Sequence, residues 1–209
     1  MIDLATPEGI EAAFTQDGTF RFARWGRPIA PIVFGVEDPT IETLKGAIEA
    51  VTGMVGHPVA ETDPELGSNL MFFFFRDWDE LLAVPDLGRM IPDLAGTVGR
   101  LKAAGAQQYR AFRFDEAGAI QASFAFLNMS GPLAELTADT IALGEAVQSM
   151  LTFSGAAFRE QSPLALHPET GVTILRPEVA RLIRAAYDPV LPAAATDPSH
   201  ALRLFARLH

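Results

Sequence analysis

The sequence contains no cysteine. This absence excludes disulfide bonds, thiol nucleophiles, iron–sulfur clusters and every zinc site that is built on thiolates. It leaves the cellular compartment open, because a cysteine-free domain folds under reducing and oxidising conditions alike. With 209 residues, the chain is long enough to bury most of its apolar surface without covalent cross-links.

Basic residues are also scarce, with 16 Lys and Arg against 26 Asp and Glu and a formal net charge of -10. Such a chain repels a phosphate backbone unless its cations gather on one face, and the densest arginine cluster, RFARWGR at residues 21–27, is too short for that. We therefore expect no nucleic-acid partner.

Long hydrophobic runs are missing as well. No stretch approaches the ~18 apolar residues that span a bilayer. The first residues, MIDLATPEGIEAAF, have neither the basic start nor the apolar centre of a signal peptide. We expect no transmembrane segment and no signal peptide in the sequence as given, and the location in the cell stays unknown.

The spacing of apolar residues predicts an α+β fold with a mixed or antiparallel sheet of about four strands packed against helices. The stretches APIVFGV, NLMFFFF, RAFRF and IQASFAF are the expected strands, and the last two form an antiparallel hairpin around the turn DEAG. Because side chains alternate along a strand, the four successive phenylalanines of NLMFFFF need cover on both faces of the sheet.

Helices are expected at residues 6–15, 38–54, 136–153 and 175–191, with a shorter terminal helix after residue 200. Residues 78–105 read as helical but broken by Pro85 and Pro92, and residues 154–171 read as a loop. We predict one domain over residues 1–209, with a core at about 20–191, the helix at 6–15 and the tail at 192–209 being appendages.

The helix that contains ALGEAVQSM has the layout of a zinc hydrolase helix without its ligands. A His-Glu-x-x-His site places two imidazoles four residues apart on one helix face, and its glutamate polarises the metal-bound water. Glu145 occupies the position of that glutamate, but Gly144 and Gln148 occupy the imidazole positions. We therefore expect no metal and no other cofactor, and we retain Glu145 and Gln148 as candidate site residues.

The remaining sequence offers no substitute for these ligands. The four histidines, His57, His167, His200 and His209, lie far apart, and we expect them to be surface or loop side chains. A Gly-x-Ser-x-Gly nucleophile motif, a phosphate-binding loop and a dinucleotide-binding glycine pattern are all missing.

Three stretches resemble a bacterial family catalogued as domain of unknown function 2927, whose members look like zincin metallopeptidases with altered active-site helices. They are FARWGRPIAPIVFG, GEAVQSML and TILRPEVARLIRAAYDPVL, and the similarity runs over about residues 20–191. The resemblance implies a zincin-like fold, in which Glu145 and Gln148 match two polar positions of the family helix while Gly144 replaces a glutamate. It also implies an envelope or periplasmic protein.

Two functions remain open. The first is a non-catalytic, zincin-like binding domain that holds an unknown protein or peptide in a groove beside the sheet edge, where an extended segment can add a strand. The second is a hydrolase, either metal-free or a metallopeptidase with unrecognised ligands. We favour the first, because both imidazoles are missing.

The same helix also yields structural expectations. Leu143, Val147 and Met150 are spaced as one buried face. Gly144 would allow close approach of a backbone segment from the hairpin, and Gln148 would form a hydrogen bond with that segment. Glu145 would lie partly solvated at the groove rim, because no Lys or Arg follows it at i+3 or i+4.

Overall fold

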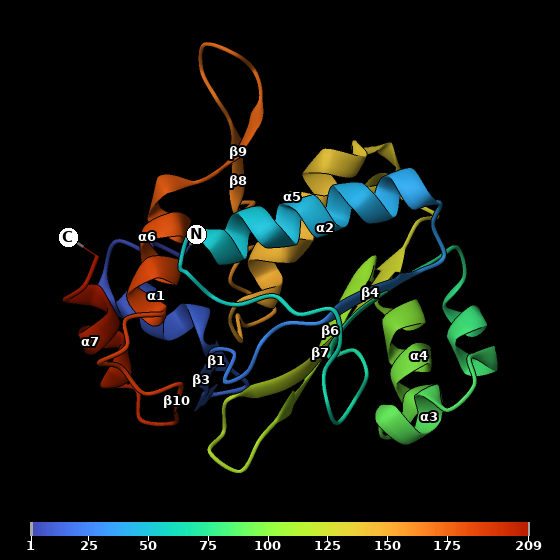
Figure 1. Cartoon of the computed structure of the whole chain (residues 1–209), viewed down its shortest axis with the longest axis horizontal. Coiled ribbons are helices and arrows are strands. Elements are labelled where there is room, and N and C mark those ends of the chain that lie inside the picture. Colours follow the sequence, from blue (N-terminus) through green and yellow to red (C-terminus); the bar gives the residue numbers. More distant parts are fainter. Residues whose placement is uncertain (1, 209) are drawn as a thin grey trace.

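The structure is a computed structural model that describes residues 2–208. A four-stranded mixed sheet lies at its centre in the order β4–β5–β7–β6 (Figure 1). These strands span Pro31–Phe34, Leu70–Phe75, Ile120–Asn128 and Gln108–Phe114 respectively. β4, β5 and β7 are parallel, and β6 pairs antiparallel with β7 through the predicted hairpin. The predicted α+β fold with about four strands is confirmed.

β5 connects two hydrophobic cores. Phe72 and Phe74 belong to the main core, whereas Phe73 and Phe75 belong to a second core on the opposite face. All four rings are buried. The prediction that this strand is covered on both faces is therefore correct.

Two long helices cover the main-core face of the sheet. They are α2 (Asp38–Gly53) and α5 (Ala138–Ser149), and they pack against each other above the strands (Figure 1). The helix expected at residues 136–153 is shorter in the structure, and α5 begins after Thr137, whose hydroxyl accepts a hydrogen bond from the Thr140 N–H at 3.3 Å.

Three short helices cover the second core. They are η1 (Trp78–Ala83), α3 (Leu87–Met90) and α4 (Leu94–Ala103). The breaks between them fall at Pro85 and Pro92, as the sequence predicts. Within residues 2–208, no helix has both the length and the apolar character that crossing a membrane requires.

Both ends of the chain contribute to the main core. α1 (Pro7–Ala13) packs against α7 (His200–Phe205), and α6 (Pro177–Ala186) lies beside them. Ile10 and Leu204 are fully buried in the core that the sheet shares with α2 and α5. The helix at residues 6–15 and the tail from residue 192, expected as appendages, thus supply core side chains.

Two segments differ from the sequence prediction. Residues 154–171 were expected to be a loop, but their second half starts a hairpin of β8 and β9 that projects from the body (Figure 1). The tail expected as an appendage at residues 192–209 contains β10 (Ala194–Ala195), which pairs with β3 (Phe22–Ala23). These strands have two or three residues, too few to display an alternating pattern. The remaining short elements are β1 (Thr15–Gln16), β2 (Thr19–Phe20), β3 (Phe22–Ala23), β8 (Leu164–Leu166), β9 (Thr173–Leu175), β10 (Ala194–Ala195) and η2 (Pro132–Glu135).

His200 was expected to be a surface or loop histidine, and that expectation is wrong. The residue is only 2% exposed, and its ring lies 4.4 Å from the ring of Phe22. Neither ring nitrogen has a hydrogen-bond partner within the described part of the chain. Burial lowers the pKa of His200, and the nearby cations Arg203 and Arg207 lower it further.

We predict that His200 makes stability depend on pH. Because the fold favours the neutral imidazole, its contribution is complete above the ordinary pKa of 6.5 and is lost as the pH falls below it. Between pH 6.5 and 5.5, the wild-type protein should lose up to about 1.4 kcal/mol more unfolding free energy than His200→Phe. Urea unfolding of both proteins at the two pH values measures this difference in unfolding free energy. Any contribution from His57 cancels, because both proteins contain it. Equal losses would contradict the prediction.

Candidate functional site

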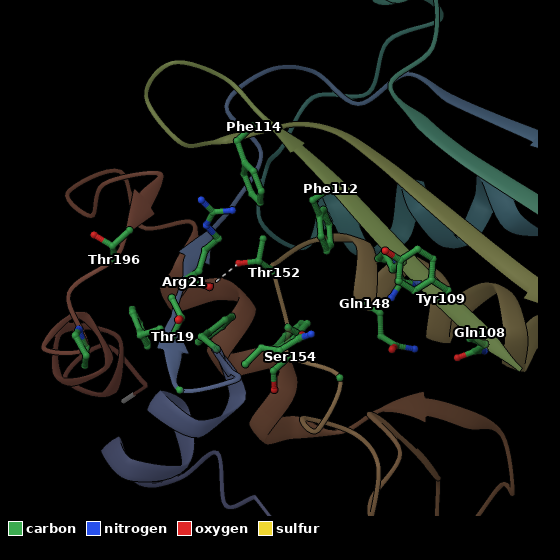
Figure 2. Close-up of a pocket in the computed structure, with 18 of the residues that line it drawn as sticks. Thr19, Arg21, Gln108, Tyr109, Phe112, Phe114, Gln148, Thr152, Ser154 and Thr196 are labelled. Atoms are coloured by element: carbon green, nitrogen blue, oxygen red, sulfur yellow. Dashed lines mark hydrogen bonds between the residues drawn. The ribbon is translucent and has the colours of Figure 1, made fainter. Parts of the chain in front are cut away.

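A cavity of about 860 Å³ lies between the edge strand β6 and the C-terminal half of α5. Its other walls come from the β1–β2 hairpin, the loop after α5 and the segment before α7 (Figure 2). Aromatic side chains line much of it: Phe14, Phe20, Tyr109, Phe112, Phe114 and Phe153. Gln148, Ser154 and Thr196 add polar groups, so the cavity offers both apolar and hydrogen-bonding surface.

A second cavity of about 510 Å³ adjoins the first along α5. It extends from α5 toward β8 and the loop that precedes β8. The two cavities share five lining residues, which are Gln108, Glu145, Gln148, Ser154 and Gly155. Because they meet along one helix, we treat them as a single groove and use that name below.

Glu145 lies at the junction of the two cavities, but it is not solvated. It is 2% exposed and forms an ion pair with Arg110 of β6. Burial raises the pKa of Glu145, and the guanidinium of Arg110 acts in the opposite direction. The expectation of a partly solvated carboxylate is therefore wrong. Its partner comes from the sheet edge, which a search along the helix does not reach.

Gln148 lines both cavities, and Figure 2 shows its amide directed into the first. Its Nε2 donates a hydrogen bond to the Gly144 carbonyl at 3.3 Å, one turn earlier in the same helix. The expected hydrogen bond to a crossing segment is therefore wrong. Within the described residues 2–208, this intrahelical bond is the one hydrogen bond of the amide, which lines the cavity.

Gly144 does not mark a close approach of another backbone. A Cβ atom at this position would meet only the Cδ1 atom of Leu164, at 3.7 Å, which is an ordinary contact. The neighbouring segment is β8, not the β6–β7 hairpin. Val147 and Met150 are buried as expected, but Leu143 is only partly buried.

The outer edge of β6 is unpaired within residues 2–208. The Asn128 N–H donates to the Gln107 carbonyl, whereas the Ser123 N–H points to the other side of β7 and donates to the Asn69 carbonyl, both at 2.8 Å. Because hydrogen bonds alternate in direction along a strand, every second residue of β6 turns its N–H and C=O away from β7. These outward residues are Gln108, Arg110 and Phe112, and we call their backbone the open edge.

Arg21 lines the first cavity, and the sequence analysis treated it only as a member of an arginine cluster. Its N–H donates to the Phe14 carbonyl at 2.9 Å, and its carbonyl accepts from the Thr152 hydroxyl at 3.0 Å (Figure 2). Its guanidinium lies over the ring of Phe114, with Cζ 4.4 Å from the ring centroid. No local pattern identifies this residue, because the loop after α5 and β6 both reach it from distant parts of the chain.

The chemistry open to the groove is limited by its side chains. Neither cavity is lined by any of the three histidines that the structure describes, His57, His167 and His200. Within residues 2–208, no group of three or more His, Asp or Glu side chains is placed to hold a metal ion. Ser154 donates its hydroxyl to the Ala12 carbonyl at 3.3 Å, so it has no basic partner there. The groove is equipped to bind through shape, aromatic contact and hydrogen bonds.

We predict that Gly144→Ala stabilises the protein by about 1 kcal/mol, because alanine has the higher helix propensity and its Cβ fits without a clash. Gly35→Ala is the matched control, since Gly35 has φ +86° and a Cβ there would collide with the Phe74 carbonyl. Chemical denaturation should show gain in the first variant and loss in the second. A loss at Gly144 would show that something does pack against it.

The Arg110–Glu145 pair should behave as a coupled unit. Glu145→Ala leaves a largely buried guanidinium without a counter-charge and should cost about 3–5 kcal/mol, as should Arg110→Ala through the orphaned carboxylate. The double variant should cost clearly less than the sum, because neither charge remains. A double-mutant cycle from urea unfolding measures the coupling, and additive losses would contradict the ion pair.

Comparison with known proteins supplies no relative: no family model, no curated protein and no solved structure matches the chain. The fold and the groove therefore stand on the contacts described above. The resemblance to family 2927 stays a prediction from the three stretches that carry it, and function has to be argued from the groove itself.

Proposed function

We propose that the chain is a non-catalytic, zincin-like binding domain whose groove holds an extended segment of a partner protein or peptide. The observation that carries the proposal is the open edge of β6, which runs beside a cavity lined by aromatic rings. An unpaired edge is a template for another strand. Recognition by strand addition takes affinity from main-chain hydrogen bonds and specificity from flanking pockets.

The position of α5 beside the groove supports the zincin-like part of the proposal. In a zincin-style site, the helix with the metal ligands borders the cleft. Here α5 borders the groove, with Glu145 and Gln148 lining both cavities and Gly144 lining the second. The three positions of a His-Glu-x-x-His motif thus face the groove, but the two imidazole positions carry no imidazole.

The state of Glu145 supports binding over hydrolysis. A general base needs a carboxylate that can reach a water molecule or a substrate proton. Glu145 is buried against Arg110, so it would have to break a partly desolvated ion pair before it acted as a base. The alternative function, a hydrolase, would therefore need a general base other than Glu145.

The open edge sets the size of the ligand. Its three residues offer up to three N–H donors and three C=O acceptors, spread over positions 108–112. At about 3.3 Å per residue, this length matches an extended segment of about five or six residues. The groove lies under the same strand, so alternate side chains of such a segment would enter it.

We predict that phage display of random decapeptides on the immobilised protein selects binders that protect the open edge. In amide hydrogen exchange by NMR, a bound peptide should slow exchange at Gln108, Arg110 and Phe112, while their inward neighbours are already bonded to β7. Protection confined to other regions, or no selected binder, would contradict strand addition.

Two variants test the place of binding. Gln148→Trp fills the groove from α5, and Gln108→Pro removes one outward N–H from the exposed start of β6. Each should weaken binding at least tenfold, whereas Glu49→Trp on the exposed face of α2 should not change it. Glu145→Lys is unsuitable as a probe, because it sets a second buried cation against Arg110.

A further inference from the structure

The first cavity contains one uncompensated charge. Its lining includes three charged side chains, Arg21, Arg110 and Glu145. The last two neutralise each other in the ion pair. Arg21 forms no ion pair within residues 2–208, although the chain as a whole carries a net charge of -10. Arg21 is an exposed residue at the wall of an aromatic cavity, and an unpaired cation in that place can bind an anion.

Within residues 2–208, the Arg21 side chain is held in position without a hydrogen bond from its guanidinium. The backbone bonds to Phe14 and Thr152 fix where its side chain starts, and the ring of Phe114 supports one face of the guanidinium. Stacking on a ring leaves the N–H groups at the edge of the guanidinium free. A planar fork of this kind is suited to bidentate binding of a carboxylate.

Apolar surface adjoins this cation. The ring of Phe14 lies 6.3 Å from that of Phe20 and 5.4 Å from that of Phe153, and all three rings line the same cavity. Phe112 enters the same cavity from β6 (Figure 2). A ligand that puts a carboxylate on Arg21 can therefore place an apolar side chain among these rings.

Arg21 lies at the end of the open edge and not along it. Phe114, which supports the guanidinium, is the last residue of β6, and a turn closed by the Gly118 N–H and the Asp115 carbonyl follows. Thr196 and Pro198, from the segment before α7, line the same cavity, and Figure 2 shows Thr196 beyond Phe114 and Arg21. A peptide strand paired with β6 therefore has no backbone of β6 to bind beyond Phe114.

From this geometry we infer that the first cavity captures the C-terminal residue of a peptide. The terminal carboxylate binds the Arg21 guanidinium, and an apolar last side chain occupies the aromatic part of the cavity. The peptide then runs parallel to β6, because its C-terminus lies at the Phe114 end. The inference rests on the proposed strand addition and adds the direction, the terminal group and the class of the last side chain.

The test uses a hexapeptide of alternating threonine and valine that ends in phenylalanine, with a fluorescent label at its N-terminus. Fluorescence polarisation compares the free acid with its carboxyamide. The free acid should bind at least tenfold more tightly, because amidation removes the charge that Arg21 recognises. A third peptide, carrying an internal phosphoserine and a C-terminal amide, tests for an internal anion.

Arg21→Gln should weaken binding of the free acid about 10- to 100-fold and should abolish its advantage over the amide. Arg21→Lys should keep part of the preference for the free acid, because lysine retains the positive charge but lacks the planar, bidentate donor geometry of the guanidinium. The backbone bonds of residue 21 are kept in both variants. Arg181→Gln, on the exposed face of α6, is the matched control and should leave affinity unchanged.

The outcomes separate the inference from the proposed function. Equal binding of acid and amide, with the open edge still protected from exchange, would overturn C-terminal capture while strand addition stands. Preference for the amidated phosphopeptide would overturn it in favour of an internal anion. If neither display-selected peptides nor the hexapeptide protect the open edge, the proposed strand addition fails with it.

Discussion

The structure depends on a strand that has to be buried on both faces. β5 carries four successive phenylalanines, and a strand that turns rings to both sides is stable only between two apolar layers. α2 and α5 form one layer, and η1, α3 and α4 form the other. On the second face, stacked rings from all four strands, Phe34, Phe73, Phe126 and Tyr109, continue this packing across the sheet with centroids 5.0, 5.1 and 6.1 Å apart.

The groove lies at the edge of the sheet that β6 forms, between this strand and α5. α5 is anchored on the main core by Val147 and Met150, and Arg110 ties it to β6 through Glu145. The ion pair connects β6 with α5, which form two walls of the groove. It therefore holds the edge strand and the helix at a fixed separation. A buried pair of this kind adds little net stability compared with apolar side chains, but it penalises any arrangement that separates the charges.

In the proposed function, the features of the groove serve binding and not catalysis. In the first cavity, the carboxylate of Glu145 is committed to a structural ion pair, the amide of Gln148 is directed into the cavity, and the Arg21 guanidinium rests on the ring of Phe114. The adjacent open edge supplies main-chain donors and acceptors. On these groups we base the proposal of a ligand with an extended backbone, an apolar side chain and a negatively charged end.

The sequence by itself determined the fold class and the longer helices and strands, but not the short strands β8, β9 and β10. The NLMFFFF strand, the hairpin around DEAG, the helices at 38–53 and 138–149 and the proline breaks all follow from local periodicity and capping, which act over a few neighbouring residues. It also selected Glu145 and Gln148, and both line the groove. Only the tertiary structure decided what surrounds them. Arg110 reaches Glu145 across 35 positions of sequence, and Thr152 reaches the Arg21 carbonyl across 131. Burial, the ion pair and the lone cation arise from contacts between distant segments, and a local pattern carries no information about such contacts.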